Sequence, residues 1–446
     1  MSKKRAVFGT FCAAFLQILG VFLITDLPVI RLLPVPGILW FLAVAAYFWA
    51  VFFPLPGLKA PKKLRQLARG RFLLRCFAWL ALFNLLLSIA CFFSPYQLWW
   101  YWLIQLFASQ LLLFPVLFSG MLRAALSSVQ LGIWRRALLL MFWWMPGFNF
   151  ALALAAAKKI GREYLEEWDR EELEQVRAES AVCATRYPIL MVHGVFFRDL
   201  HYFNYWGRIP TALKRNGAAI YYGEQPSADT VADCGSILRR RILQILEETG
   251  SEKVNIIAHS KGGLDARYCI SMLGMGDRVA SLTTVNTPHN GCAYADVLLK
   301  KVPERVRQQI ARRYNSTLAK FGEQDADFLG AINDLTVENC TAFNELAADD
   351  PRVYYQSIGS RMKNGRSAPF PVSWSYHLVK AFSNENDGLV DTASQHWGEN
   401  FRMLEPAGKR GISHGDMIDL WRQNIPGFDV REFYVDLVSE LKNKGF

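Results

Sequence analysis

The first 160 residues of this 446-residue chain contain 16 Lys and Arg but only one acidic residue, Asp26. Between the basic residues lie five apolar stretches, each close to the about 20 residues that a helix needs to cross a membrane. They are residues 6–25, 36–56, 76–94, 97–119 and 137–157. A soluble helical domain would need a charged outer face. The pattern therefore predicts a membrane region of about five transmembrane helices over residues 1–157.

Lys and Arg are concentrated in alternate connections between these stretches. Seven lie between the second and third stretches, whereas none lies between the third and fourth. Basic residues tend to stay on the cytoplasmic side, so we expect a multi-pass protein of the cell membrane with a cytoplasmic N-terminus. Five crossings would place the C-terminal domain outside the cytoplasm. If residues 137–157, interrupted by Pro146-Gly147, re-enter without crossing, that domain would instead be cytoplasmic.

The rest of the chain has a different composition. Residues 161–446 carry 34 basic and 38 acidic side chains, so the net charge of +11 comes from the N-terminal third. Positive charge that accompanies apolar stretches indicates a membrane rather than a nucleic acid. The eight cysteines form no CxxC pair and predict neither a zinc site nor a disulfide framework. Residues 158–186 are rich in helix formers and in both signs of charge, which predicts an exposed helical linker.

From residue 187 onward, short apolar stretches alternate with amphipathic ones. The expected strands are residues 189–192, 218–222, 254–258, 279–285 and 353–358, and the expected helices are residues 233–249, 263–272 and 428–444. Such alternation predicts an α/β domain over residues 187–446, with a mostly parallel sheet flanked by helices.

Ser260 follows the expected strand at 254–258 and precedes an expected helix. The surrounding Ala258-His259-Ser260-Lys261-Gly262 matches the nucleophile elbow G-x-S-x-G, with alanine in place of the first glycine. Small residues on either side of the serine allow a sharp strand-to-helix turn that exposes its hydroxyl. The pattern predicts that Ser260 is a catalytic nucleophile, and we expect His259 to be structural.

Two backbone N–H groups are needed to stabilise the oxyanion that forms when a serine attacks an ester. The residue after the nucleophile, Lys261, is expected to supply one. The other is expected from Val195, which follows the strand at 189–192 and the pair His193-Gly194. His193 precedes the serine in the chain and is expected to brace this loop.

A serine hydroxyl also needs a general base, and the base needs a carboxylate that orients it. Asp387 and His414 follow Ser260 in the chain order of one known arrangement of such triads. The sequence therefore predicts the triad Ser260, His414 and Asp387. His396 is an alternative base, and Glu385 is an alternative acid.

Residues 187–425 resemble bacterial triacylglycerol lipases of the α/β-hydrolase superfamily. The resemblance rests on Val192-His193-Gly194, residues 258–263, Asn286-Thr287-Pro288-His289-Asn290-Gly291, Asn386-Asp387-Gly388-Leu389-Val390 and His414-Gly415-Asp416. It implies a lid within residues 293–349 and a structural role for His289. The aromatic residues after the oxyanion strand would line an acyl pocket or belong to the core; they are Phe196, Phe197, Tyr202, Phe203 and Trp206.

Some lipases of this kind hold a structural calcium ion with an Asp two residues after the catalytic histidine. Asp416 occupies that position and is the candidate ligand, but residues 352–386 contain no Asp that could supply the expected second ligand. We therefore expect that no cofactor is required.

Together these features predict a membrane-anchored lipase or carboxylesterase that hydrolyses lipid esters through an acyl-enzyme. One alternative is an acyltransferase or deacylase that acts on membrane lipids or lipid-anchored molecules. A second is a membrane protein whose hydrolase domain only binds partners.

Overall fold

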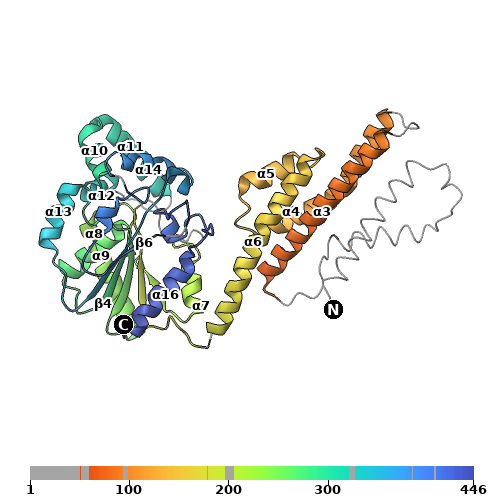
Figure 1. Cartoon of the computed structure of the whole chain (residues 1–446). Coiled ribbons are helices and arrows are strands. Elements are labelled where there is room, and N and C mark those ends of the chain that lie inside the picture. Colours follow the sequence, from red (N-terminus) through yellow and green to blue (C-terminus); the bar gives the residue numbers. More distant parts are fainter. Residues whose placement is uncertain are drawn as a thin grey trace. The chain divides into compact units, whose positions relative to one another are not determined.

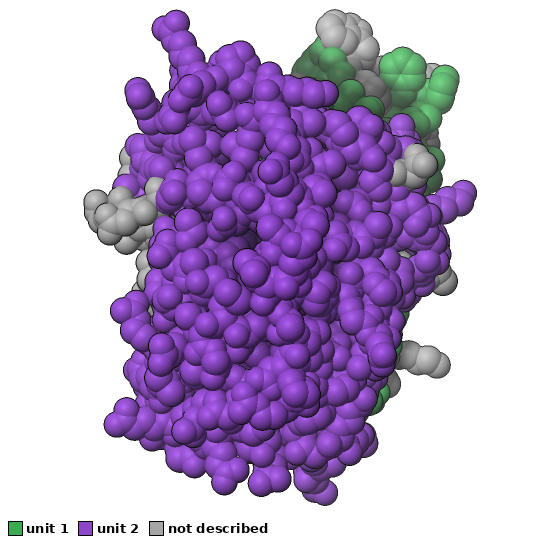
Figure 2. Space-filling model, turned by 90° about the vertical axis from the view of Figure 1, so that its left-hand side faces the viewer, with its two compact units in different colours: residues 1–173 green, residues 174–446 purple. Residues whose placement is uncertain are grey.

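The computed structural model describes residues 51, 60–93, 99–177, 179–195, 205–320, 327–383, 385–405 and 408–446. The chain divides into two compact units, residues 1–173 and 174–446, which Figure 2 colours separately. The predicted spans over residues 6–25 and 36–56 lie outside the described residues, apart from Val51.

The described part of the first unit is helical. It contains α3 (Lys62–Phe92), α4 (Trp99–Ser127), α5 (Ile133–Met141) and the start of α6 (Phe148–Arg177). Helices α3 and α4 pack closely where glycines face each other, because a Cβ on Gly70 would lie 3.2 Å from the carbonyl oxygen of Gly120. Among the residues that the structure describes, no helix combines the length and the apolar character needed to cross a membrane. The prediction of transmembrane helices over 76–94 and 97–119 is therefore not supported.

The predicted fifth span, residues 137–157, is not a single helix. Helix α5 ends at Met141, and α6 begins only at Phe148. The intervening turn contains Pro146, which has no N–H to donate, and Gly147, which has a φ of +81° that suits glycine.

The segment over residues 158–186 was predicted to be an exposed helical linker, and the structure differs in how much of it is exposed. Helix α6 continues without a break to Arg177, and part of it is buried rather than exposed. Glu163 is 1% exposed, and its carboxylate accepts hydrogen bonds from the backbone N–H groups of Val129 and Gln130 at 3.0 and 3.2 Å. These contacts tie the middle of α6 to the loop that follows α4.

The second unit is built on a parallel sheet, as the sequence predicts, and this sheet has six strands (Figure 1). The strand order is β2-β1-β3-β4-β5-β6. The strands are β1 (Ile189–Val192), β2 (Ile220–Tyr222), β3 (Val254–His259), β4 (Val279–Val285), β5 (Tyr354–Ser360) and β6 (Phe401–Leu404). All except β6 correspond to strands expected from the sequence.

The helices of this unit connect the strands. They are α7 (Ile209–Arg215), α8 (Val231–Thr249), α9 (Lys261–Ser271), α10 (Ala293–Lys301), α11 (Glu304–Lys320), α12 (Phe328–Asp334), α13 (Val337–Leu346), α14 (Val372–Lys380), α15 (Thr392–Gln395) and α16 (Val430–Asn443). Two short 3₁₀ turns, η2 (Gly365–Ser367) and η3 (Asp416–Ile418), complete the described elements.

Alternate residues of the strands point to opposite faces of the sheet, and both faces are buried. In β1, Leu190 and Val192 pack into a cluster with side chains of α8 and α9. Ile189 and Met191 pack on the other face, with side chains of α7 and α16. Burial on both faces explains why β1 is continuously apolar.

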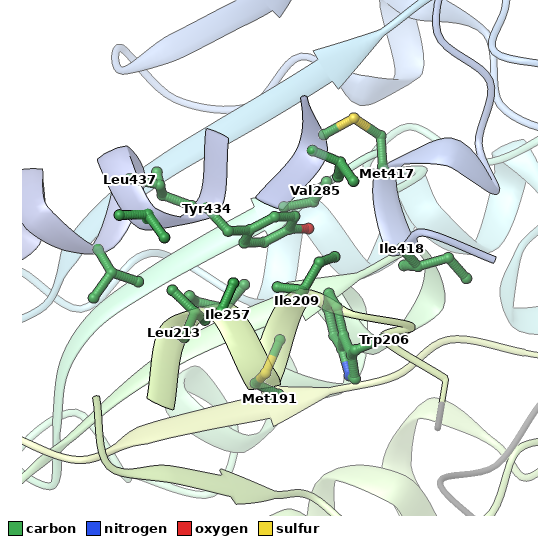
Figure 3. Packing of buried hydrophobic residues seen from close by; sticks show 14 of the residues in the cluster. Met191, Trp206, Ile209, Leu213, Ile257, Val285, Met417, Ile418, Tyr434 and Leu437 are labelled. Carbon is green, nitrogen blue, oxygen red and sulfur yellow. The ribbon is translucent and has the colours of Figure 1, made fainter. Parts of the chain in front are cut away.

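Figure 3 shows part of the cluster on the α7 and α16 face. Trp206, completely buried, lies there with Ile209 and Tyr434. Trp206 is therefore a core residue, which is the second of the two roles expected for it from the sequence. The other aromatic residues of that prediction, residues 196, 197, 202 and 203, lie outside the described residues.

Candidate active site

Ser260 forms the turn between β3, which ends at His259, and α9, which begins at Lys261. Its φ and ψ are 56° and −134°, a strained conformation for a residue other than glycine. The backbone N–H of Ser260 donates to the carbonyl of Val285 at 2.9 Å, which fixes the turn to β4. A Cβ on Gly262 would lie 2.4 Å from the carbonyl oxygen of His193, so the second position after the serine must be glycine. This geometry is that of a nucleophile elbow.

The loop after β1 lies directly against this turn. A Cβ on Gly194 would lie 2.6 Å from the Cβ of Ser260. The backbone N–H of Gly194 donates to the hydroxyl of Tyr205 at 3.1 Å, and the same hydroxyl lies 2.8 Å from Nδ1 of His259. Tyr205 thereby links the loop to the end of β3, a role that the sequence did not indicate.

The two predicted oxyanion donors, Val195 and Lys261, flank this contact. Val195 directly follows Gly194 and is buried. Lys261 is the first residue of α9, so its backbone N–H has no carbonyl partner within the helix. Val195 and Lys261 are thus the sequence neighbours of Gly194 and Ser260, the two residues that approach each other closely.

The structure brings together Asp387 and His414. Nδ1 of His414 lies 2.7 Å from Oδ2 of Asp387, and the backbone N–H of His414 donates to the carbonyl of Asp387 at 2.8 Å. Both side chains are buried. The ring of His414 is 4.5 Å from that of His259, centroid to centroid, which places it beside the residue that precedes Ser260.

The carboxylate of Asp387 is held by three further donors. Oδ1 accepts from the backbone N–H groups of Leu389 and Val390 at 2.8 and 2.7 Å. Oδ2 accepts from Nδ2 of Asn286 at 2.7 Å, and this amide also donates to the hydroxyl of Ser360. Asn286 has a φ of +48° and follows β4 directly. The sequence marked this stretch only through family resemblance, and gave no role to the asparagine.

The two alternative residues lie in different surroundings. His396 is exposed, and its ring packs against Phe401 at a centroid distance of 4.5 Å. Glu385 is exposed and forms an ion pair with Arg361. Neither alternative has the buried, shared hydrogen bond that joins Asp387 to His414.

The remaining histidines near the site are part of the scaffold. Burial lowers the pKa of His259 and that of His289 well below the ordinary value, so both rings are neutral. Nε2 of His289 lies 3.0 Å from the hydroxyl of Thr284, and its ring stacks on Trp397. Nδ1 of His193 lies 2.9 Å from the carbonyl oxygen of Gly194, within the loop after β1.

The side chain of Lys261 is buried in an ion pair that the sequence did not reveal. Its ammonium donates to Oδ1 of Asp265 at 2.7 Å and to Sγ of Cys234 at 3.4 Å, and the side chains of Lys261 and Asp265 are each 2% exposed. Burial alone would lower the pKa of Lys261, but the nearby Asp265 and, to a smaller extent, Cys234 raise it above its ordinary value. The pair anchors the first turn of α9, immediately after Ser260.

The surroundings of Asp416 do not fit a calcium site. Oδ2 accepts from the backbone N–H and the hydroxyl of Ser413 at 2.8 and 2.7 Å, and Oδ1 pairs with Arg410 at 3.0 Å. An arginine therefore already neutralises this carboxylate. Within the described chain, no three acidic, His or Cys side chains gather in a way that could hold a metal ion.

The predicted lid region, residues 293–349, contains the helices α10 to α13. A cavity of ≈ 280 Å³ lies where α10 begins, next to the end of α14 and the loop after Asp387. Its lining residues are Cys292, Ala293, Tyr294, Val379, Phe382, Ser383, Leu389, Asp391 and Ala393.

Comparisons with known proteins agree with this fold. A family model described as alpha/beta hydrolase fold matches residues 187–407. A triacylglycerol lipase of Vibrio cholerae serotype O1 is 30% identical over 273 residues, which cover 54% of this chain and 86% of that protein. A triacylglycerol lipase of Pseudomonas fragi is 28% identical over 293 residues, covering 58% and 98% of the two chains.

Among solved structures, that of Staphylococcus hyicus lipase has a TM-score of 0.46 and 16% identity, covering 58% of this chain and 97% of that one. From the family model and the relatives, the chain belongs to the α/β-hydrolase family and is a serine ester hydrolase similar to bacterial triacylglycerol lipases.

Proposed function

We propose that this protein is a membrane-associated lipase that hydrolyses carboxylic esters of lipids, with Ser260, His414 and Asp387 as its catalytic triad. The observation that carries the proposal is the buried 2.7 Å hydrogen bond between His414 and Asp387 beside the strained turn at Ser260. A histidine oriented in this way can accept the proton of a serine hydroxyl.

In the proposed reaction, Oγ of Ser260 attacks the ester carbonyl carbon while Nε2 of His414 takes the hydroxyl proton. The N–H groups of Val195 and Lys261 stabilise the oxyanion. When the tetrahedral intermediate collapses, the bond to the alcohol breaks and His414 returns the proton to the leaving oxygen. Water then attacks the acyl-enzyme and gives its proton to His414, and the free acid leaves as Ser260 regains a proton.

Asp387 orients His414 and stabilises its charged form during both steps. Because Leu389, Val390 and Asn286 already donate to its carboxylate, this side chain has one favoured position. The imidazole is then held with Nδ1 toward the carboxylate and Nε2 free to serve the nucleophile.

Membrane association is proposed from the first unit. Residues 1–160 carry a net charge of +15 along with the apolar stretches described above. Large apolar side chains are exposed on the described helices of this unit, among them Trp79, Leu126, Ile133 and Trp134 at 61%, 80%, 76% and 80%. Exposed apolar surface on this scale favours contact with lipid.

A fluorophosphonate probe tests the chemistry directly, because it forms a stable bond only with an activated serine. We expect labelling at Ser260 in the full-length protein, hydrolysis of p-nitrophenyl esters, and loss of both in Ser260→Ala. A Ser260→Ala protein that still hydrolyses esters would overturn the assignment. Cell fractionation tests the association, and a protein found only in the soluble fraction would contradict it.

A further inference from the structure

Four large apolar side chains lie in a row along α14 and its flanks. Phe370, Trp374, Leu378 and Phe382 are spaced by four residues and are 76%, 63%, 40% and 45% exposed. Residues four apart lie on the same side of a helix. The opposite side of α14 is buried through Val372, Tyr376 and Val379. Trp374 and Leu378 therefore lie on the outer face of a helix that is anchored from beneath, and Phe370 and Phe382 flank its two ends. These four residues are here called the α14 stripe.

The stripe is unusual for a protein surface. Single exposed apolar residues are normal, whereas a row of large ones usually marks a site of interaction. Helix α14 also lies outside the predicted lid at residues 293–349. The stripe is thus a separate feature of the second unit that the catalytic machinery does not use.

The charged residues within the stripe's own segment are all basic. Residues 361–382 contain four basic residues and no acidic one. Arg366 and Lys380 are exposed beside the stripe, and so is Lys409, whose carbonyl accepts a hydrogen bond from Asn364 at 2.9 Å. Arg361 is the exception, because Glu385 and Glu405 neutralise it. An apolar row flanked by cations complements a surface that is apolar inside and anionic outside.

The stripe also leads toward the catalytic loop. Phe382, its last member, lines the cavity of ≈ 280 Å³ together with Val379. Leu389 and Asp391 line the same cavity and follow Asp387 by two and four residues. One end of the stripe therefore borders a cavity that the loop after Asp387 also lines.

We propose that the α14 stripe is the surface through which the catalytic unit contacts an anionic lipid bilayer. The Trp, Phe and Leu side chains enter the interface, while Arg366 and Lys380 bind lipid phosphates. The proposal rests on the proposed function for the choice of lipid as partner, but the contact itself requires no catalysis. A protein partner would also cover an apolar row, and the experiments below distinguish it.

The first experiment uses full-length protein with Ser260→Ala, so that no lipid is consumed. The protein is placed in lipid nanodiscs of phosphatidylcholine, alone or with about one third phosphatidylglycerol. The rate of backbone hydrogen exchange in residues 370–383 is compared between the two kinds of disc. We expect slower exchange in the anionic discs, and the extra protection should disappear in Lys380→Glu. Equal exchange in both kinds of disc would overturn the proposal and favour a protein partner.

The second experiment measures catalysis with two substrates, a lipid ester in anionic vesicles and a monomeric short-chain ester in water. Trp374→Ser and Leu378→Ser are compared with Leu243→Ser, a matched control because Leu243 is 45% exposed on α8. We expect the vesicle concentration at half-maximal rate to rise about five-fold or more in the stripe variants and in Lys380→Glu. Activity on the monomeric ester should stay within about two-fold of wild type, which also shows that the variants fold.

The outcomes separate the two proposals. Equal loss on both substrates, or the same loss in Leu243→Ser, would overturn the role of the stripe. If the wild type hydrolyses no ester, the proposed function is overturned. The hydrogen-exchange experiment would still decide whether α14 contacts lipid.

Discussion

The loop that carries Gly194 approaches Ser260 so closely that a Cβ on the glycine would lie 2.6 Å from the Cβ of the serine. A methyl group there must push the loop away, and with it the N–H of Val195. We expect Gly194→Ala to lower kcat by about 10²-fold or more, with a smaller effect on KM. Steady-state kinetics on a p-nitrophenyl ester provide the measurement.

Gly274→Ala is the control for this substitution, since Gly274 has a φ of +67° and open space around its Cα. It should cost some stability through backbone strain but leave kcat unchanged. A Gly194→Ala enzyme with wild-type kcat would show that Val195 is not an oxyanion donor.

The hydrogen bond that Asn286 donates to Asp387 leads to a second prediction. Glycine is the informative replacement, because the φ of +48° would strain an alanine. Without the amide, the carboxylate of Asp387 loses one of its donors, and we expect kcat of Asn286→Gly to fall about ten-fold. Steady-state kinetics provide the measurement, and an unchanged kcat would make Asn286 a purely structural residue.

The two candidate bases are separated by their surroundings. His414→Ala should lower kcat at least about 10³-fold, because no other base is oriented by a buried carboxylate. His396→Ala should stay within about two-fold of wild type, since the exposed ring only packs against Phe401. The opposite ranking would transfer the role of base to His396.

The buried pair of Lys261 and Asp265 makes a prediction about stability. In Lys261→Met, the carboxylate of Asp265 would be left buried and unpaired, at a cost of about 3–5 kcal/mol. Lys261→Met combined with Asp265→Leu should recover most of that loss, because neither charge remains. Urea unfolding of the three proteins gives the comparison. If the double variant is no more stable than Lys261→Met, the cost arises from packing rather than from charge.

The buried histidines give a prediction for pH. Burial lowers the folded-state pKa of His289 below its ordinary value of 6.5, so only the unfolded chain binds this proton readily. The stability due to the neutral ring is therefore complete above pH 6.5 and is lost as the pH falls below it. Each pH unit should remove about 1.4 kcal/mol per histidine.

His259 should contribute in the same direction, because burial also lowers its pKa. Unfolding free energies of wild type and His289→Gln, measured at about pH 7.5 and pH 5.5, test the effect. Between about pH 7.5 and pH 5.5, the unfolding free energy of the wild type should fall by more than that of His289→Gln. The difference should correspond to the uptake of one extra proton on unfolding. Equal losses would mean that His289 is protonated in the folded state.

Much of the second unit was predictable from local patterns. A strand that is apolar throughout, such as β1, can only be buried on both faces, and the bounds of β1 and β4 were both predicted correctly. The strand β6 was missed because Arg402 interrupts its apolar character at the edge of the sheet. A strand at the edge of a sheet can contain more polar residues than a central strand, since one of its sides has no neighbouring strand.

The site was predictable where the chemistry leaves a sequence signal. The elbow pattern placed Ser260 at a turn between a strand and a helix, where the structure has it. The chain order pointed to Asp387 and His414, whose side chains share a hydrogen bond. Asn286 and Tyr205 carry no such signal, because their importance comes from what they touch across 101 and 54 positions of sequence. Contacts of this range depend on the folded topology and not on local pattern.

The first unit was less predictable. Apolar stretches in residues 76–119 were predicted to be helical and are helical, but their length alone does not show whether they cross a membrane. The prediction for residues 137–157 failed because hydropathy averages over Pro146-Gly147, where the backbone ends one helix before the next begins.

The ion pair of Arg410 with Asp416 bears on where such an enzyme can work. The loop that presents His414 is tied down by a positive charge that is part of the same polypeptide. An ion that must be captured from solution can be removed by dilution or by competing ligands, whereas an arginine side chain cannot. We therefore expect His414 to be held equally well in calcium-poor and calcium-rich surroundings, so that the supply of divalent ions would not limit the compartment in which the protein acts.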